Sequence, residues 1–504
     1  MRDILIIGSG AGGGPLALTL SEAGFDVLVL EKGPEYQRED YTADEVDNFW
    51  SGRFVPPLDE EPHMLVHADL AAPRPTHLGW TACCVGGGTV HMGAYFSRFH
   101  PDDFRMATRF GAHQEIADWP YTYDELEPYY SRAEWAVGVS GVAGLNPVEG
   151  PRSRPYPLPP LDTHPVGHRL DDACRRLRRV AFPTPRGINS RPYASRPTCR
   201  YCSVCASYGC RYGARGSSQE ALLTRAVANG RCEVRSPAMA HLITTRRDGR
   251  VDGCLYYDTA GREHLVQARV VCVCCSSIES ARLLLLSQSA LFPDGLANSN
   301  GRVGRHLQFH GTSIGQGCFR PDRRPELFVD GGSPFLGRTL GDHYFLPEGV
   351  GDLPKGGLIV FQKSRTGPIS LAKSIAQRDQ PTAWGSALKQ HLRRRDRNDV
   401  ESLFFEVHHD FLPNAETFIE LDPEVRDRWG LPVARIHLHE SPHQEQAGRY
   451  LVDRGLEVFD EMGADTVLPV AIGETAPYLV HGTCRAGHDP ATSVVDATCR
   501  THEV

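Results

Sequence analysis

The sequence lacks any apolar run as long as the roughly 18 residues that a membrane-spanning helix needs. It also lacks a signal peptide, because Met1 to Asp3 lead directly into the apolar stretch Ile4 to Ile7 with no small-residue cleavage site. We therefore expect a cytoplasmic protein with no membrane partner. Positive charge is not in excess, since the net charge is −8, and this argues against nucleic acid as a partner.

The composition is that of an ordinary globular chain. Its 504 residues exceed what one hydrophobic core organises, so two packed domains are expected. The fifteen cysteines are expected to be reduced thiols rather than a disulfide framework. A short charged run from Arg393 to Arg397 is expected on a solvated helix face.

The first motif lies at the N-terminus. A short apolar strand ends at Gly8, the pattern Gly8-x-Gly10-x-x-Gly13 opens a helix that runs to about residue 23, and a strand over 27–30 ends at Glu31. These glycines permit a tight turn, a close approach of backbone to a pyrophosphate, and close helix–strand packing. Glu31, 18 residues after Gly13, suits a ribose with a free 2′-hydroxyl. The pattern predicts a site for FAD or NAD, and its position near the start of the chain favours FAD.

The second motif is glycine-rich as well. Residues 79–105 contain Gly86-Gly87-x-Thr89-x-His91, followed by Arg98. This pattern resembles the flavin-contacting loop of the glucose-methanol-choline (GMC) oxidoreductases. Later blocks resemble the same family in the same order: residues 119–130, 270–287, 300–307, 421–432 and 481–496.

The resemblance implies an α/β fold with a Rossmann-like FAD-binding domain and a discontinuous α+β substrate domain built on a mostly antiparallel sheet. We expect the FAD domain over 1–150, 200–315 and 465–504, and the substrate domain over 151–199 and 316–464. The cofactor is FAD, contacted by the two motifs: Gly8, Gly10, Gly13, Glu31, Gly86, Gly87, Thr89 and His91.

His91 has two interpretations. Some members of the family carry at this position a histidine bonded covalently to the flavin, and the glycines beside it would allow that approach. Alternatively, His91 packs against the flavin or bonds to the backbone.

The densest cysteine spacing is Cys199-x2-Cys202-x2-Cys205-x4-Cys210. Such spacing is compatible with zinc or an iron–sulfur cluster, and some GMC dehydrogenases hold a cluster near this point. The sequence favours a loop of free thiols, because cluster-free relatives carry similar cysteines, so no metal is assigned.

Two departures from the family concern catalysis. In GMC enzymes a histidine in His-x-x-Gly-Thr takes the alcohol proton, but here Gly482-Thr483 places Leu479 at that position. His481 is the candidate instead, because residues two apart on a strand share a face; a structural role beside the Gly-Thr turn is the alternative. The family pattern also continues past Val504 with a core strand and a second catalytic residue, so we expect the 504-residue form to be poorly active alone.

The histidines at 408 and 409, and those at 437 and 439, lie in alternating strands and are expected to face solvent or a substrate cavity. The overall pattern implies an FAD-dependent oxidation of a CH–OH group of a sugar or aminosugar, with oxygen or another electron acceptor. Two alternatives are a catalytically impaired flavin-binding homologue and a dehydrogenase that passes electrons through an iron–sulfur cluster.

Overall fold

The computed structural model describes residues 1–504 except 51, 81, 112–114, 203, 321–335, 352, 364–368, 370–384, 387–388 and 390–400. The charged run Arg393 to Arg397 therefore lies outside the described residues. In the part of the chain that is described, no helix combines the length and the apolar character that crossing a membrane requires.

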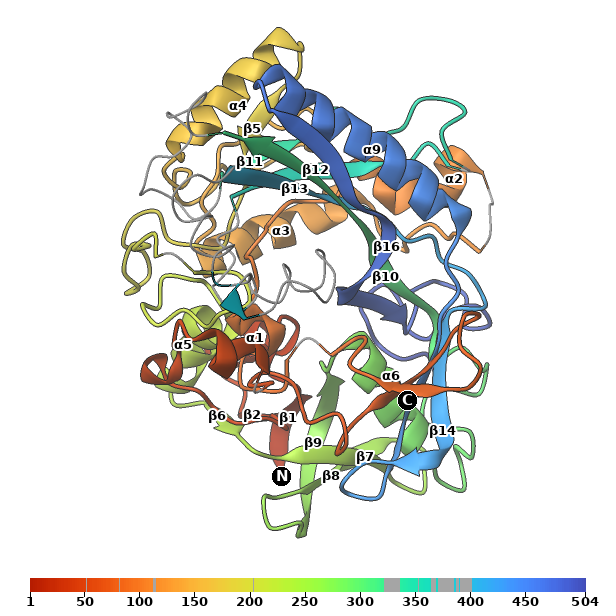
Figure 1. Ribbon diagram of the computed structural model, residues 1–504. Coiled ribbons are helices and arrows are strands. Elements are labelled where there is room, and N and C mark those ends of the chain that lie inside the picture. The colour runs from red at the N-terminus through yellow and green to blue at the C-terminus, as the bar shows by residue number, and fades with distance from the viewer. Residues whose placement is uncertain are drawn as a thin grey trace.

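The first sheet carries the N-terminal motif and has the strand order β6-β2-β1-β9-β8-β7. Its first four strands are parallel, and β7 and β8 extend it as an antiparallel meander. Helices α1, α5 and α6 pack beside it (Figure 1). The bounds are β1 (Arg2–Ile7), α1 (Gly13–Glu22), β2 (Val27–Leu30), α5 (Thr224–Ala228), β6 (Cys232–Arg235), β7 (Met239–Thr245), β8 (Val251–Tyr257), β9 (Glu263–Val273) and α6 (Ser277–Leu286).

The second sheet is antiparallel throughout, with the order β16-β10-β13-β12-β11-β5. Two helices, α4 and α9, lie across one of its faces (Figure 1). The bounds are α4 (Pro165–Arg176), β5 (Ala181–Pro183), β10 (Arg305–Phe319), β11 (Arg338–Leu340), β12 (Gly357–Gln362), β13 (Glu401–Asp410), α9 (Pro442–Glu461) and β16 (Thr466–Thr483).

Alternation along β13 gives this sheet one apolar and one polar face. Leu403, Phe405 and Val407 are fully buried in the core formed with α4 and α9. Because successive side chains on a strand point to opposite faces, Glu406 and His408 lie on the other side of the sheet. The antiparallel substrate sheet with its helices on one side confirms the expected fold class.

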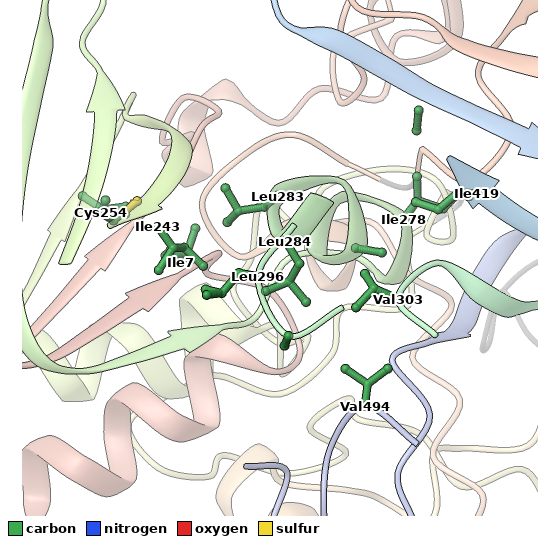
Figure 2. Close-up of a cluster of buried hydrophobic side chains, with 14 of the residues drawn as sticks. Ile7, Ile243, Cys254, Ile278, Leu283, Leu284, Leu296, Val303, Ile419 and Val494 are labelled. Atoms are coloured by element: carbon green, nitrogen blue, oxygen red, sulfur yellow. The ribbon is translucent and has the colours of Figure 1, made fainter. Parts of the chain in front are cut away.

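A third sheet of four strands, order β14-β15-β3-β4, was not expected from the sequence. It packs near α6, where Leu65, Ile278, Ile419 and Ile436 belong to one buried cluster (Figure 2). Its strands are β3 (His63–Val66), β4 (Arg74–Thr76), β14 (Phe418–Arg426) and β15 (Pro432–His437). Two further α-helices are α2 (Met106–Phe110) and α3 (Tyr123–Val137).

The sheets cross the expected domain limits at three points. β10 begins inside the segment expected for the FAD domain, and β16 lies wholly inside 465–504, yet both pair in the substrate sheet. The third sheet joins β3 and β4 of one expected domain to β14 and β15 of the other. Sequence patterns locate a strand but do not name its partner, which explains these differences.

Candidate active site

The turn after β1 is built around glycine. Gly8 has φ +98°, and a Cβ on it would come within 2.5 Å of the Cys274 carbonyl oxygen. At Gly13, in the first turn of α1, a Cβ would lie 1.9 Å from the Gly8 carbonyl oxygen. Helix α1 can therefore approach β1 this closely only without a side chain at position 13, as the motif predicted.

The two glycine-rich motifs meet each other. A Cβ on Gly87, whose φ is +54°, would lie 3.0 Å from the Gly10 Cα, so the two backbones are nearly in contact. Gly86 also has positive φ and no room for a side chain, since Gln219 and Val90 lie against it. Gly10 itself has nothing closer than 3.8 Å on its Cβ side, which leaves its backbone open.

Glu31 ends β2 as a buried carboxylate held by hydrogen-bond donors. Its Oε2 accepts from the Ser9 N–H at 3.1 Å and from Ser9 Oγ at 2.6 Å, and its Oε1 accepts from the Gly33 N–H at 3.0 Å. Burial raises the pKa of Glu31, and these donors oppose that rise.

Ser9 is a residue of the candidate site that the sequence analysis missed. Its hydroxyl donates to Glu31 and accepts from the Gly86 N–H at 2.9 Å, and its carbonyl accepts from Ser218 Oγ at 2.7 Å. Thr89 completes the link, because its Oγ1 accepts from the Ser218 N–H at 2.8 Å. Ser9 occupies a variable position of the glycine motif, so the pattern alone does not single it out.

A cavity of about 700 Å³ runs along these groups. Its wall contains the glycine turn, the start of the second motif, the segment 238–240 beyond β6, and the polar face of the substrate sheet. Of the predicted cofactor residues, those in the wall are Gly8, Gly10, Glu31, Gly87, Thr89 and His91. Gly13 and Gly86 are not part of the wall; they permit the close backbone packing behind it.

The cavity fits FAD on the evidence of its own groups. Gly10 offers open backbone beside the N-terminus of α1, where a pyrophosphate would be favoured. Glu31 offers a buried carboxylate whose few donors leave capacity for ribose hydroxyls. When FAD is bound, it supplies the hydride acceptor, and the residues around Gly87 and His91 would hold its ring system.

The far end of the cavity is polar. Gln362, Glu406 and His408 of the substrate sheet line it together with His310. The His310 and His408 rings lie 5.2 Å apart, and Gln362 Nε2 donates to Glu406 Oε2 at 2.9 Å. Burial lowers the pKa of His310 to about 3. The sequence analysis did not single out His310. Its expectation of solvent or a cavity agrees with the structure for His408 but is wrong for His409, which is buried beside Ser313 and is absent from the cavity wall.

Comparison with known proteins identifies the fold and the cofactor. The chain matches the N-terminal domain of the GMC oxidoreductases over residues 76–312, their C-terminal domain over 413–504, and an FAD-binding domain over 3–39. It is 32% identical to 6'''-hydroxyparomomycin C oxidase of Streptomyces lividus, an alignment that covers 99% of this chain and 84% of the relative. The chain belongs to the GMC oxidoreductase family.

Other relatives agree with this assignment. Paromamine 6'-oxidase of Streptomyces fradiae is 30% identical over 99% of this chain and 84% of its own. 2-Methyl-1,2-propanediol dehydrogenase of Mycolicibacterium austroafricanum is 28% identical over 100% of this chain and 88% of its own. The pyridoxine 4-oxidase structure from Mesorbium loti covers 100% of this chain and 92% of its own with a TM-score of 0.59 and 17% identity, and it supports the GMC fold. The protein is thus an FAD-dependent oxidoreductase of alcohol groups, as the sequence predicted.

His91, the GMC-loop histidine, faces the cavity from the end of the 3₁₀ turn Gly87–Val90. Its ring stacks on Phe54 with centroids 4.8 Å apart and planes 10° from parallel, and its carbonyl accepts from the Ser207 N–H at 2.7 Å. Both interpretations of His91 therefore stay predictions, since the residue lines the cavity and Phe54 also holds its ring.

The cysteine loop packs against this turn. All fifteen cysteines are free, and Ala206 and Ser207 of the loop belong to the cavity wall. Burial raises the pKa of Cys199 to about 12, which favours the thiol over the metal-binding thiolate. Within the described ranges, no three His, Cys, Asp or Glu side chains are arranged to hold a metal ion.

Near the end of β16, Leu479 lines the cavity but His481 does not. Leu479 has φ +48°, its side chain is among the exposed apolar groups, and it lines the cavity with Tyr478 and Val480. His481 is absent from that wall, although Gln308 pairs with it across the bulged β10–β16 ladder. The left-handed residue and the bulges interrupt the two-residue alternation on which the prediction of a shared face rested.

Behind the polar end of the cavity, which we call the substrate end, lies a cluster of charged residues from segments that are distant in the sequence. Lys355 Nζ lies 2.7 Å from Asp103 Oδ1 and 3.6 Å from Asp410 Oδ2, and Tyr344 donates to Asp103. The carboxylates raise the pKa of Lys355 against the opposing effect of its burial. This cluster fixes the end of β13 beside the cavity.

Proposed function

We propose that the protein oxidises a CH–OH group of a sugar or aminosugar, with FAD as hydride acceptor and oxygen or another electron acceptor closing the cycle. The relatives named 6'''-hydroxyparomomycin C oxidase, paromamine 6'-oxidase and 2-methyl-1,2-propanediol dehydrogenase favour a polyhydroxylated substrate.

The observation that carries this proposal is the polar end of the cavity. Gln362, Glu406 and His408 present an amide, a carboxylate and an imidazole from adjacent strands, and His310 adds a second imidazole. Such a wall offers several hydrogen bonds to hydroxyl groups, whereas a simple apolar alcohol would leave these groups unsatisfied.

The substrate proton needs an acceptor within hydrogen-bond reach. We propose His408, because it lines the cavity and its Nε2 lies 3.7 Å from Glu406 Oε2. The lowered pKa of His310, about 3, makes it a poor holder of a proton. His481 stays the competing candidate from the family resemblance.

Two substitutions separate these histidines. We expect His408→Asn to slow anaerobic flavin reduction by about 10² to 10⁴-fold, and His481→Asn to slow it by less than tenfold. Stopped-flow absorbance of the flavin band measures both. If flavin reduction is slow in His481→Asn and fast in His408→Asn, His481 would be assigned as the proton acceptor instead.

A catalytically impaired homologue is the second candidate. Leu479 favours it, since a leucine stands in the wall where the resemblance expects the proton acceptor. Anaerobic mixing with a panel of sugars and aminosugars decides between the two. Bleaching of the flavin band by any of them supports the oxidase or dehydrogenase; retained FAD that no polyol bleaches would support the impaired homologue.

A further inference from the structure

The cavity wall contains three carboxylates in different electrostatic settings. Glu31 accepts backbone and hydroxyl donors from its own turn. Glu279 lies 3.1 Å from Arg282 and 4.0 Å from Lys32, which neutralise it. Glu406 differs from both, because among the residues described here it has no lysine or arginine within 4.0 Å and no backbone donor.

The partners of Glu406 leave its charge uncompensated. Gln362 donates one neutral amide hydrogen bond, and His408 Nε2 lies 3.7 Å away. Its side chain keeps 30% of its surface accessible, so it is neither sealed in the core nor fully in water. A carboxylate in such a place attracts a cation more strongly than a surface carboxylate does, because the surroundings screen it less.

Two tyrosines line the same cavity as this carboxylate. Burial raises the pKa of Tyr95 and of Tyr478, and the charge of Glu406 adds to the rise in each. Tyrosine rings attract ammonium groups through their faces and can accept hydrogen bonds through their hydroxyls. The guanidinium of Arg186 stacks on the Tyr95 ring at 4.3 Å, and Arg186 is absent from the cavity wall.

We infer that Glu406, with Tyr95 and Tyr478, forms an ammonium subsite, so the alcohol that this enzyme oxidises carries a protonated amine. This inference rests on the proposed function and narrows its substrate class from sugars in general to cationic aminosugars. The carboxylate supplies a charge-assisted hydrogen bond, and the rings supply a surface that a neutral hydroxyl group does not exploit equally.

The test uses the full-length holoenzyme and a matched pair of substrates, methyl glucosaminide and methyl glucoside, which differ by an ammonium in place of a hydroxyl. We expect kcat/KM for flavin reduction to favour the amine by about tenfold or more, the worth of a hydrogen bond to a charged group. Glu406→Gln should remove most of this preference. Glu420→Gln, an exposed carboxylate on β14 paired with His437, is the control and should retain it.

The ratio of kcat/KM between the two substrates distinguishes an effect on recognition of the amine from an effect on the chemical step. An equal loss on both substrates in Glu406→Gln would overturn the inference and assign Glu406 to proton transfer or folding. A wild-type preference for the neutral glucoside would overturn it as well.

Binding separates failure of the inference from failure of the proposed function. If neither sugar reduces the flavin, titration of the oxidised holoenzyme with methyl glucosaminide, followed by perturbation of the flavin spectrum, still reports the subsite. Saturable binding that weakens about tenfold in Glu406→Gln would retain the ammonium subsite without the oxidation; equal or absent binding of both sugars would overturn it.

Discussion

The two ends of the cavity are built in different ways. At the FAD end, Ser9 and Gly33 hold the Glu31 carboxylate through groups that all lie within the first 33 residues. At the substrate end, Lys355 joins Asp103 to Asp410 across more than half of the sequence. The first end is therefore encoded in a local motif, and the second exists only once the 3₁₀ turn Pro101–Arg105, the segment before β12 and the end of β13 have come together.

Lys355→Met offers the most severe test of this difference. It leaves the buried carboxylate of Asp103, and the partly exposed one of Asp410, without their cation, so we expect the free energy of unfolding to fall by about 3 kcal/mol or more. Denaturant titration measures it. Lys389→Met, at an exposed position, should stay within about 0.5 kcal/mol of the wild type. Equal, small effects of both variants would mean that the cluster is not needed for the substrate end.

Gly13→Ala tests the local end through backbone packing. A Cβ would meet the Gly8 carbonyl oxygen at 1.9 Å, so we expect a loss of about 3 kcal/mol, together with release of FAD during purification. Gly12→Ala is the matched control, because its Cβ would make an ordinary contact of 3.7 Å with Cys274. Flavin content per protein is the measurement, and a flavin-free Gly12→Ala would show that the whole turn, rather than one contact, excludes side chains.

The same difference explains what the sequence could predict. The expected strand, turn, helix and strand at the N-terminus match β1, α1 and β2 to within a few residues, because each is set by neighbours in the chain. His310 went unnoticed since nothing beside it distinguishes it from other histidines. It becomes a cavity residue only through the pairing of β10 with β13, which brings it near His408.

The β10–β16 pairing marks where local rules fail. The expectation that Leu479 and His481 share a face assumed regular extended backbone, but four register shifts and the positive φ of Leu479 break that regularity. Bulges depend on how two strands twist against each other, and a single sequence does not specify them.

Glu31→Gln sharpens the comparison at the cofactor end. Ribose hydroxyls donate more strongly to a carboxylate than to an amide, so we expect FAD to bind about tenfold more weakly or worse. Fluorescence titration of the apoprotein with FAD gives the dissociation constant. Glu22→Gln, in an exposed pair with Arg225, should leave it unchanged, and an unchanged constant in both variants would remove Glu31 from the cofactor site.

The stability of the apoprotein should also depend on pH in a way that reports the burial of Glu31. Burial raises the pKa of Glu31 in the folded chain, so the folded state binds more protons than the unfolded state just above the ordinary carboxyl range. This contribution is full below the unfolded pKa of about 4.3 and is lost as the pH rises through the folded value. Urea titrations across this pH range should find that the free energy of unfolding declines less in Glu31→Gln than in the wild type. Parallel plots of this free energy against pH would mean that the carboxylate is not desolvated.

The smallest effect is expected where a charge pair is local and exposed. Arg449 and Glu445 pair one turn apart on α9 with a 2.7 Å contact, but both side chains are more than 60% accessible. Solvent screens such pairs, so Arg449→Ala should change the free energy of unfolding by less than about 0.5 kcal/mol. Measured beside Lys355→Met in the same denaturant series, it compares an exposed local pair with a buried pair between distant segments, since each substitution removes one cation. A loss above about 1 kcal/mol in Arg449→Ala would show that charge pairing itself, and not its burial between segments distant in the sequence, stabilises this part of the molecule.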